Sequence, residues 1–540
     1  MARHRHLVAV GLLPLAVLAV FFVYPVVGMV ARGFVVDGHV EPAAVLDVLA
    51  RSRTHRVLWF TLWSAGLATV LTVLLGLPVA FALYRLDFPG RGLLRAAVTV
   101  PFVLPTVVVG VAFRQLLAPS GWLGRLGLDG SAAAIVAALV FFNISVVVRT
   151  VGSLWESLDP RREDAARVLG ASRWALLRTV TLPSLRPAIA SAAVVVFLFC
   201  ATAFGVVLTL GGIRRANLET EIWLLTSQQL DLTGAAGLSI LQVTVIVVLL
   251  VLTKRFEAGA HSSGVARPAR PVRTSDLPVL VWTAAVLGFL ALPVLGLVAR
   301  SLQYDGRWTL ANYAALGSDN TLLAVPVAQA LSNSLQIAGV AATLALTLGA
   351  MVAWVVAQRG RTPTARVALR SLDAAFMLPL GVSAVTVGFG FLVTLAGPPL
   401  RLLDWPWLVP IAQAMVALPL VVRTLLPVLR GIDDRQRQAA SSLGASPWRV
   451  LLSVDLPVAW RALLAAAGFA FAVSLGEFGA TSFLVRDEVP TLPVVIYRLI
   501  GHPGPHNAAM AMAASVLLAA ITAGIMLAVE RLRVRGMGGF

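Results

Sequence analysis

Long apolar runs, separated by short polar segments, make up most of the chain. A helix needs about 20 apolar residues to cross the roughly 30 Å of hydrocarbon in a bilayer, and most of the runs come close to that length. We therefore predict an all-α polytopic membrane protein with about twelve transmembrane helices. The expected spans are 7–30, 59–83, 96–116, 132–148, 188–210, 238–252, 277–298, 331–357, 374–395, 407–422, 462–484 and 508–529.

The apolar runs and the polar segments between them occur twice, 274 positions apart. Residues 165–174 read Ala-Ala-Arg-Val-Leu-Gly-Ala-Ser-Arg-Trp, and residues 439–448 read Ala-Ala-Ser-Ser-Leu-Gly-Ala-Ser-Pro-Trp. Self-similarity of this kind predicts two fused copies of one membrane unit. With six spans in each copy, the copies are parallel and related by an axis along the membrane normal, an arrangement that suits a transporter. The expected parts are a first half at 1–253, a flexible cytoplasmic linker at 254–276 and a second half at 277–540.

Composition and charge agree with this fold class. Hydrophobic residues make up 59% of the chain and charged residues 13%, and the mean hydropathy is +0.88. The net charge of +18 comes from basic residues concentrated in alternate connecting segments. This bias predicts cytoplasmic N- and C-termini in a bacterial inner membrane and argues against a nucleic-acid-binding face. The first apolar run is longer than that of a secretory signal, so we expect an uncleaved span. With Cys200 as the only cysteine, no disulfide forms within the chain.

The repeated polar segments at 159–186 and 431–461 predict a short helix, a tight turn and a second helix. Asp159 in the first copy, and Asp433 or Asp434 in the second, are candidate N-caps. Gly170 and Gly444 are candidate stops, because glycine readily adopts the left-handed conformation. Small alanine pairs between cap and stop let another surface approach closely, which favours docking of a partner. The alternative is a pair of loop helices lying on the bilayer, but such helices have a wide apolar face.

These segments resemble the coupling loop, the "EAA" motif, of the permeases of binding-protein-dependent ABC importers. In that family the loop docks into a cleft of an ATPase subunit and passes ATP-driven closure to the membrane helices. The resemblance implies two ATPase copies and an extracytoplasmic solute-binding protein as partners. The sequence departs from the motif where the second copy has a neutral glutamine at the acidic position. The implied coupling residues are Asp164, Ala165, Ala166, Gly170, Leu182 and Pro183, and Gln438, Ala439, Ala440, Gly444, Leu456 and Pro457.

ATP hydrolysis is expected to belong to another chain. A phosphate-binding P-loop needs Gly-Lys-Ser or Gly-Lys-Thr, so that the lysine reaches the phosphates. The only lysine, Lys254, follows Thr253 and precedes Arg255. We therefore expect no enzyme activity and no bound cofactor in this chain, with ATP and magnesium held by the partner ATPase. The sequence also shows no nucleophile–base pairing and no metal constellation.

The solute is suggested only by resemblance. Residues 204–212, 218–223, 474–479 and 491–493 are similar to the fused thiamine permeases, and the fused ferric-iron permeases have similar phrases. We expect thiamine as the solute, with ferric iron as the alternative. Two rivals from other classes are a secondary transporter driven by an ion gradient and a membrane scaffold without transport. The coupling segments and the scarcity of acids in the spans argue against the secondary transporter.

Glu477 is the candidate residue for contact with the solute. It falls inside the expected span 462–484, where a charged group is costly and commonly functional. Its counterpart in the first half is Ala203, so the acid is not part of the repeated scaffold. The alternative is a hydrogen bond between helices. His502 and His506, in an expected outer loop, make a poor ferric site, because ferric iron prefers oxygen ligands.

Overall fold

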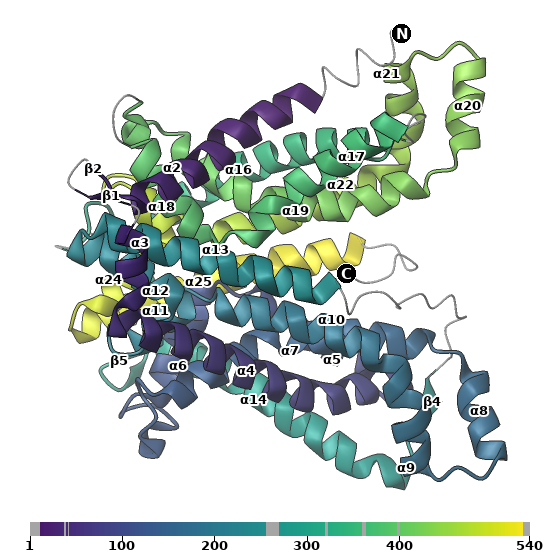
Figure 1. Ribbon diagram of the computed structural model, residues 1–540. Coiled ribbons are helices and arrows are strands. Elements are labelled where there is room, and N and C mark those ends of the chain that lie inside the picture. Colours follow the sequence, from purple (N-terminus) through teal and green to yellow (C-terminus); the bar gives the residue numbers. More distant parts are fainter. Residues whose placement is uncertain are drawn as a thin grey trace. The chain divides into compact units, whose positions relative to one another are not determined.

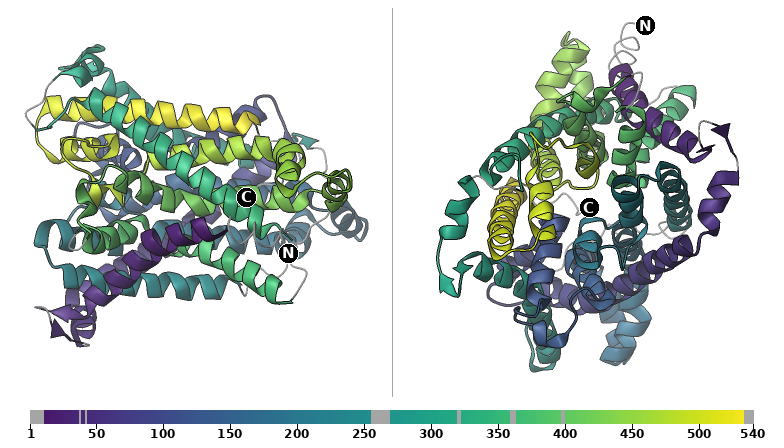
Figure 2. Two further views of the ribbon diagram at one scale, coloured as in Figure 1. Left: turned by 90° about the horizontal axis from the view of Figure 1, so that it is seen from above. Right: turned by 90° about the vertical axis from the view of Figure 1, so that its left-hand side faces the viewer.

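The computed structural model describes residues 11–36, 39–41, 43–254, 269–318, 322–358, 363–396 and 400–532. These residues are almost entirely helical, and the helices are joined by short connections (Figures 1 and 2). Within them, ten helices are long and apolar enough to cross a membrane, or eleven if one bent pair counts as a span. The predicted all-α polytopic fold is confirmed, and the count falls slightly below the expected twelve. Most of the expected linker, residues 255–268, lies outside the described residues.

The helices form two compact units. Unit 2 comprises Ala50–Glu221 and Leu241–Arg307, and unit 1 comprises the described parts of Met1–Leu49, Ile222–Ile240 and Trp308–Gly536. The boundary between the units falls at the last residue of α3 (Ala43–Ala50), and within α12 (Leu218–Leu224), α13 (Leu232–Lys254) and β6 (Arg307–Trp308).

Unit 2 is built around α4, which packs against α7 and α10. At the crossing of α4 and α7, a Cβ on Gly76 would come within 3.0 Å of Val147 Cγ1, so glycine allows the two backbones to approach closely. The elements of this unit are α4 (Ser52–Arg85), β3 (Leu86–Asp87), α5 (Arg91–Val103), α6 (Thr106–Leu117), η2 (Gly124–Leu126), α7 (Ala132–Ser157), α8 (Pro160–Val168), α9 (Arg173–Leu176), η3 (Leu177–Thr181), α10 (Leu182–Ala201), α11 (Gly205–Gly211), β4 (Arg270–Pro271), η5 (Thr274–Asp276), α14 (Leu277–Ser301) and β5 (Gln303–Tyr304).

Unit 1 repeats the plan with α16 packed against α19 and α22. Here a Cβ on Gly349 would lie only 2.6 Å from Val421 Cγ1. The first helix runs from Gly11 to Gly33 in the described residues. It includes η1 (Ala19–Val23) and α2 (Tyr24–Gly33), and the other elements are β1 (Val35–Val36), β2 (His39–Val40), α3 (Ala43–Ala50), η4 (Leu225–Gln229), α15 (Ala311–Ala314), η6 (Ala315–Gly317), α16 (Val327–Val356), α17 (Pro363–Met377), η7 (Leu378–Gly381), α18 (Ala384–Thr394), η8 (Leu402–Asp404), α19 (Leu408–Gly431), α20 (Asp434–Ser442), α21 (Pro447–Val450), η9 (Leu451–Asp455), α22 (Leu456–Leu475), α23 (Thr481–Leu484), α24 (Leu492–Gly501) and α25 (Pro505–Leu532).

The packing units cut across the repeat seen in the sequence. The helix at the start of the chain packs through α2 against α18 of unit 1, whereas α14, the first helix after the expected linker, packs against α4 and α6 of unit 2. Each repeat therefore lends its first helix to the packing unit built mainly from the other repeat. The predicted division into 1–253, 254–276 and 277–540 refers to the repeat in the sequence, and it stays a prediction.

The third span of each half is broken, which corrects two expected spans. The expected span 96–116 is the pair α5 and α6, bent by 99° at Leu104 and Pro105. The expected span 374–395 includes the end of α17, the 3₁₀ turn η7 with Pro379, and α18. Proline has no amide hydrogen and its ring clashes with the preceding turn, so a helix ends or bends there.

The fifth spans begin and end earlier than expected. Instead of 188–210 and 462–484, the spanning helices are Trp174–Ala201 and Trp448–Leu475. Each contains one turn of π-helix, η3 or η9, in which the amide of Leu182 or Leu456 bonds to the carbonyl five residues back. The second part of each expected coupling loop, 159–186 and 431–461, is therefore a rigid extension of a spanning helix. Only the first helix and the turn of each segment stand apart.

Candidate functional site

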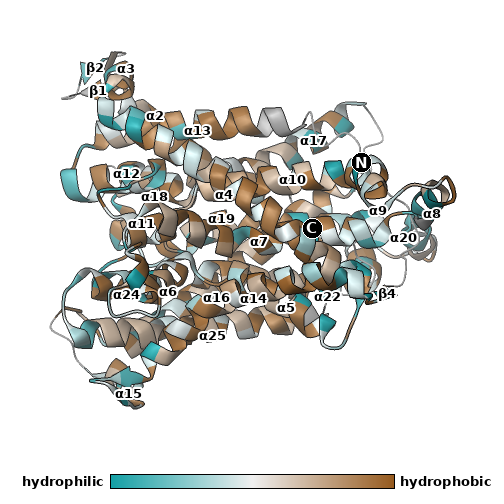
Figure 3. Cartoon of the chain, turned by 90° about the horizontal axis from the view of Figure 1, so that it is seen from below, coloured by the Kyte–Doolittle hydropathy of each residue, from teal (hydrophilic) through white to brown (hydrophobic). Residues whose placement is uncertain are grey.

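The repeated polar segments form two similar hairpins, one in each unit. In the first, α8 is followed by a turn and α9; in the second, α20 is followed by a turn and α21. Both α8 and α20 are hydrophilic, whereas apolar residues predominate along the long helices (Figure 3). We call these two elements the α8 hairpin (159–176) and the α20 hairpin (433–450).

Both short helices begin at an aspartate cap, as predicted. Asp159 Oδ1 accepts a hydrogen bond from the amide of Arg161 at 2.9 Å. Asp433 Oδ1 accepts one from the amide of Arg435, also at 2.9 Å, so Asp433 rather than its neighbour is the cap. Each carboxylate satisfies an amide that has no partner within its helix and lies at the positive end of the helix dipole.

Both helices also end at the predicted glycines. Gly170 has φ +81° and Gly444 has φ +83°. The amide that follows each glycine bonds back to the carbonyl of Ala166 at 3.0 Å, or of Ala440 at 3.1 Å, which completes a Schellman turn. A Cβ at either glycine would meet nothing within 4 Å, so the left-handed backbone, and not crowding, requires glycine here.

The hairpins expose apolar side chains at repeated positions. Leu169 is 86% exposed and Leu443 is 89% exposed. Trp174 and Trp448, just beyond the turns, are 68% and 64% exposed. Large apolar groups this open, set among polar residues, mark a surface for contact with another molecule.

An ion pair ties the α8 hairpin to the long helix α4. Arg85 Nη2, in the last turn of α4, lies 2.9 Å from Glu163 Oε2, and the two side chains are 13% and 9% exposed. Glu163 also lies 3.9 Å from Arg167 of the same hairpin. Because the Arg85–Glu163 pair is largely shielded from water, it fixes α8 more firmly than a surface pair would.

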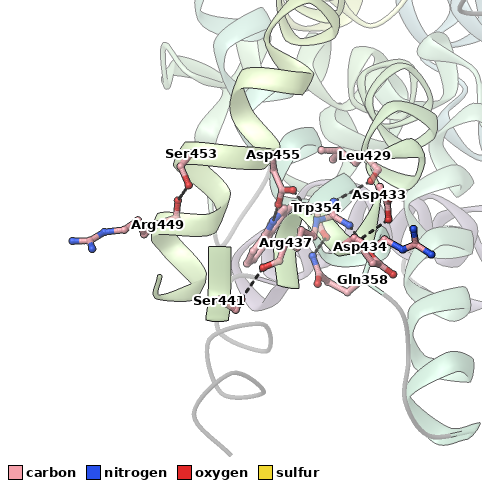
Figure 4. Close-up of polar contacts among 11 residues, drawn as sticks. Trp354, Gln358, Leu429, Asp433, Asp434, Arg437, Ser441, Arg449, Ser453 and Asp455 are labelled. Carbon is pink, nitrogen blue, oxygen red and sulfur yellow. Dashed lines mark hydrogen bonds and ion pairs between the residues drawn. The ribbon is translucent and has the colours of Figure 1, made fainter. Parts of the chain in front are cut away.

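The α20 hairpin is held by a pair of opposite polarity (Figure 4). Arg437 Nε donates to Asp455 Oδ1 at 2.7 Å, and these side chains are 11% and 3% exposed. The same guanidinium donates to the carbonyl of Leu429 at 3.0 Å and to Asp434 Oδ1 at 3.2 Å. Trp354 Nε1 donates to the other carboxylate oxygen of Asp455 at 3.2 Å. Arg437 therefore joins α20 to α19 and to the π-turn that leads into α22.

Sequence reasoning missed these anchors. None of Glu163, Arg437 and Asp455 was among the predicted site residues. The available signal was that Arg437 stands at the repeat position of Glu163, with its charge reversed.

The predicted coupling residues occupy different surroundings. Asp164 is exposed and lies 3.5 Å from Arg167, while Gln438 is exposed at the equivalent place. Ala165 and Ala439 are exposed, and the following alanines are half-buried. The Leu-Pro pairs at 182–183 and 456–457 lie inside the continuous helices, away from the turns. The structure thus brings the Asp/Gln-Ala-Ala and glycine positions together in each hairpin, and leaves the Leu-Pro pairs apart from them.

Glu477 lies just beyond the end of α22, and not in the middle of a spanning helix as expected. Its buried carboxylate accepts hydrogen bonds from the amides of Ala480 at 2.8 Å and Thr481 at 3.0 Å, and from the Thr481 hydroxyl. Gln413 Nε2 donates to that hydroxyl at 3.2 Å. Glu477 therefore holds the turn that begins α23, and its contact with a solute stays a prediction.

The two histidines of the expected outer loop are exposed, and His502 Nδ1 lies 2.8 Å from the carbonyl of Arg498. In the described part of the chain, no group of three or more His, Cys, Asp or Glu side chains is placed to hold a metal ion.

Comparisons with known proteins agree with the repeat. The family described as "Binding-protein-dependent transport system inner membrane component" matches residues 72–260 and 345–535. The thiamine transport system permease protein ThiP of Brucella abortus (strain 2308) is 28% identical over 504 residues, which cover 90% of this chain and 89% of that protein. A probable ABC transporter permease protein, y4fN, of Sinorhizobium fredii is 28% identical with the same coverage. Among solved structures, a bacterial ABC transporter for alginate import aligns with a TM-score of 0.42 and 18% identity, over 47% of this chain and 96% of that one.

Proposed function

Because the chain belongs to the family of binding-protein-dependent transport system inner membrane components, and is thus an ABC importer permease, we propose that its solute is thiamine. The chain passes the solute from an extracytoplasmic binding protein to the cytoplasm. It is fused from two permease halves and spans the membrane many times, with its N- and C-termini in the cytoplasm. ATP and magnesium are bound by two copies of a separate ATPase, since the single lysine of this chain, Lys254, lies outside any P-loop pattern.

The observation that supports an importer driven by two ATPase copies is the pair of matching hairpins. Two similar exposed apolar tips, at Leu169 and Leu443, suit a twofold partner with two equivalent grooves. We assign the α8 and α20 hairpins as the elements that dock on the two ATPase copies. Asp164 and Gln438 differ in charge, so any ion pair with the ATPase at this position is confined to the first copy.

The hairpins are built to transmit movement to the membrane helices. From Trp174 and Trp448, each second hairpin helix continues into a spanning helix, and each first helix is tied by a shielded ion pair to its own unit. When the ATPase dimer closes on ATP, the hairpins move with it and carry the long helices with them. The bundle then accepts solute from the binding protein, and hydrolysis restores the inward-open state.

The choice of thiamine rests on similarity over nearly the whole chain. Relatives described as thiamine permeases match about 90% of it at 28% identity, while y4fN carries no solute in its description. Ferric iron is the alternative. We assign Glu477 to the solute pathway, where its buried carboxylate would favour a cationic solute such as thiamine.

Uptake of labelled thiamine and labelled ferric iron, in cells with and without this chain, tests the proposal. Loss of thiamine uptake alone supports thiamine, and loss of iron uptake alone overturns that choice while keeping the importer. Copurification with the ATPase separates the importer from a secondary transporter. Gly170→Val with Gly444→Val should abolish both uptake and copurification, whereas a secondary transporter would keep partner-independent uptake.

A further inference from the structure

An open pocket of about 340 Å³ lies beside the α20 hairpin in unit 1. It is bounded by the end of α16, by α17, by the end of α19 and by α20. Four arginines line it, Arg366 and Arg370 from α17, Arg430 from α19 and Arg437 from α20, against a single lining carboxylate, Asp434. Such an excess of guanidinium groups makes the pocket attractive to an anion.

The four arginines differ in how far they are already neutralised. Arg437 is committed to Asp455 and Asp434, as described above. Arg430 Nη2 reaches Asp373 only at 3.6 Å, and its side chain is 54% exposed. In the described ranges, no ion pair involves Arg366 or Arg370. These two arginines lie four positions apart, on neighbouring turns of one helix.

The first half carries a similar pair of arginines in a neutralised setting. Arg91 and Arg95 are also four positions apart, at the start of α5. Arg95 donates to the carbonyl of Leu83 at 2.7 Å, pairs with Glu156 at 3.3 Å and stacks over the Tyr84 ring at 4.0 Å.

The second half lacks two acids that pair with arginines in the first half, Glu156 with Arg95 and Glu163 with Arg85. At the repeat positions of Glu156 and Glu163 stand Arg430 and Arg437. Two acids have thus been exchanged for two bases on the same scaffold. The exchange at Glu163 supplies the anchor Arg437, which is paired with Asp455. The exchange at Glu156 adds Arg430, a further guanidinium beside the pocket whose contact with Asp373 is 3.6 Å long.

We propose that this pocket binds a phosphate group, from either an anionic phospholipid headgroup or a soluble phosphate. The planar guanidinium forks of Arg366 and Arg370 suit bidentate recognition of phosphate oxygens, with Arg430 closing the site from α19. Exposed apolar side chains on α17 and just beyond its end, Val367 at 62% and Leu378 at 54%, give a lipid's acyl chains a surface to lie on. The site is separate from the proposed solute pathway and does not depend on the identity of the solute.

The test is a binding titration of the purified full-length chain in neutral detergent. Short-chain phosphatidylglycerol, short-chain phosphatidylcholine and inorganic phosphate are added at constant ionic strength, and the thermal unfolding midpoint reports saturable binding. We expect phosphatidylglycerol, inorganic phosphate or both to bind, and R366Q/R370Q to weaken that binding at least tenfold. R370K, which keeps the charge but not the fork, should be weakened as well, and it serves as the test if the double variant fails to fold.

R461Q is the matched control, because Arg461 is an exposed arginine of the same unit that does not line the pocket. It should bind within about twofold of the wild type. Binding of inorganic phosphate without phosphatidylglycerol assigns the site to soluble phosphate, and the reverse assigns it to lipid. The proposal is overturned if neither anion binds saturably, if the pocket variants bind like the wild type, or if R461Q loses as much affinity as they do.

Discussion

Removing Arg437 tests whether the α20 hairpin is anchored by its ion pair. In R437M the stem is kept and the guanidinium is lost, so Asp455, which is 3% exposed, is left as a buried charge without its cation. Breaking a buried pair in this way costs about 3–5 kcal/mol. The cost should fall at the lower end, because Asp455 keeps the hydrogen bond from Trp354 Nε1. Loss of the contact with Asp434 adds little to this cost, because Asp434 is 32% exposed and water replaces the guanidinium there.

A second substitution, D455N, distinguishes the loss of the ion pair from a general loss of packing. In R437M/D455N no uncompensated charge remains, so the double variant should recover a large part of the stability that R437M loses. The expected coupling energy between the two positions is about 1–3 kcal/mol. Unfolding free energies come from denaturant titration of the purified chain in micelles, and copurification with the ATPase reports whether the α20 hairpin is still presented.

The first half supplies a matched pair for the same cycle. R85M and R85M/E163Q probe the α8 hairpin, where the acid is on the hairpin and the base on the long helix. Because the two anchors share no residue, we expect the effects of the two cycles to add. The reasoning is refuted if R437M is as stable as the wild type. It is also refuted if the unfolding free energy that R437M/D455N loses equals the sum of the losses in R437M and D455N.

Three further changes test the hairpins and Glu477. Gly444→Val should cost about 1–3 kcal/mol of backbone strain, whereas Gly444→Asn should cost less because asparagine tolerates the left-handed region; equal unfolding midpoints for the two variants would contradict a conformational role. Leu443→Asp should leave the unfolding midpoint unchanged, because the side chain is 89% exposed, but should reduce ATPase copurification, with Leu169→Asp as its repeat-equivalent partner; intact copurification in both would remove the assigned docking face. Glu477→Ala should lower the unfolding midpoint by freeing the turn before α23 and should reduce uptake, while unchanged stability and uptake would argue for a scaffold without transport.

The sequence predicts the features of the fold that depend on residues close together in the chain, and not those that depend on contacts between distant helices. Spans follow from apolar run length, which is a local property, so their existence was predictable. The breaks at Pro105 and Pro379 were missed because the apolar runs continue across them, although the prolines themselves were visible. The exchange of first helices between packing units was not predictable, since helices in lipid lack a hydrophobic force that selects one apolar neighbour over another.

The same distinction holds within the candidate site. Asp159 and Gly170 act on amides and carbonyls within a few residues, so cap and turn chemistry identified both. The anchor of Glu163 is Arg85, 78 positions earlier, and that of Arg437 is Asp455, 18 positions later. A charge in the sequence does not name its partner at such separations.

The two hairpins share an exposed residue and differ in their buried ones, whereas a repeated core usually keeps its buried residues. Their buried anchors have diverged to opposite polarity, while Leu169 and Leu443, almost fully exposed, stand at the same repeat position. Packing within this chain explains the anchors, because either polarity holds a hairpin in place. It does not explain the leucines, which are largely open to solvent and would be replaceable by polar residues at no cost to folding. The proposed docking on a partner would account for them, which is why the exposed tips, and not the buried pairs, support that proposal.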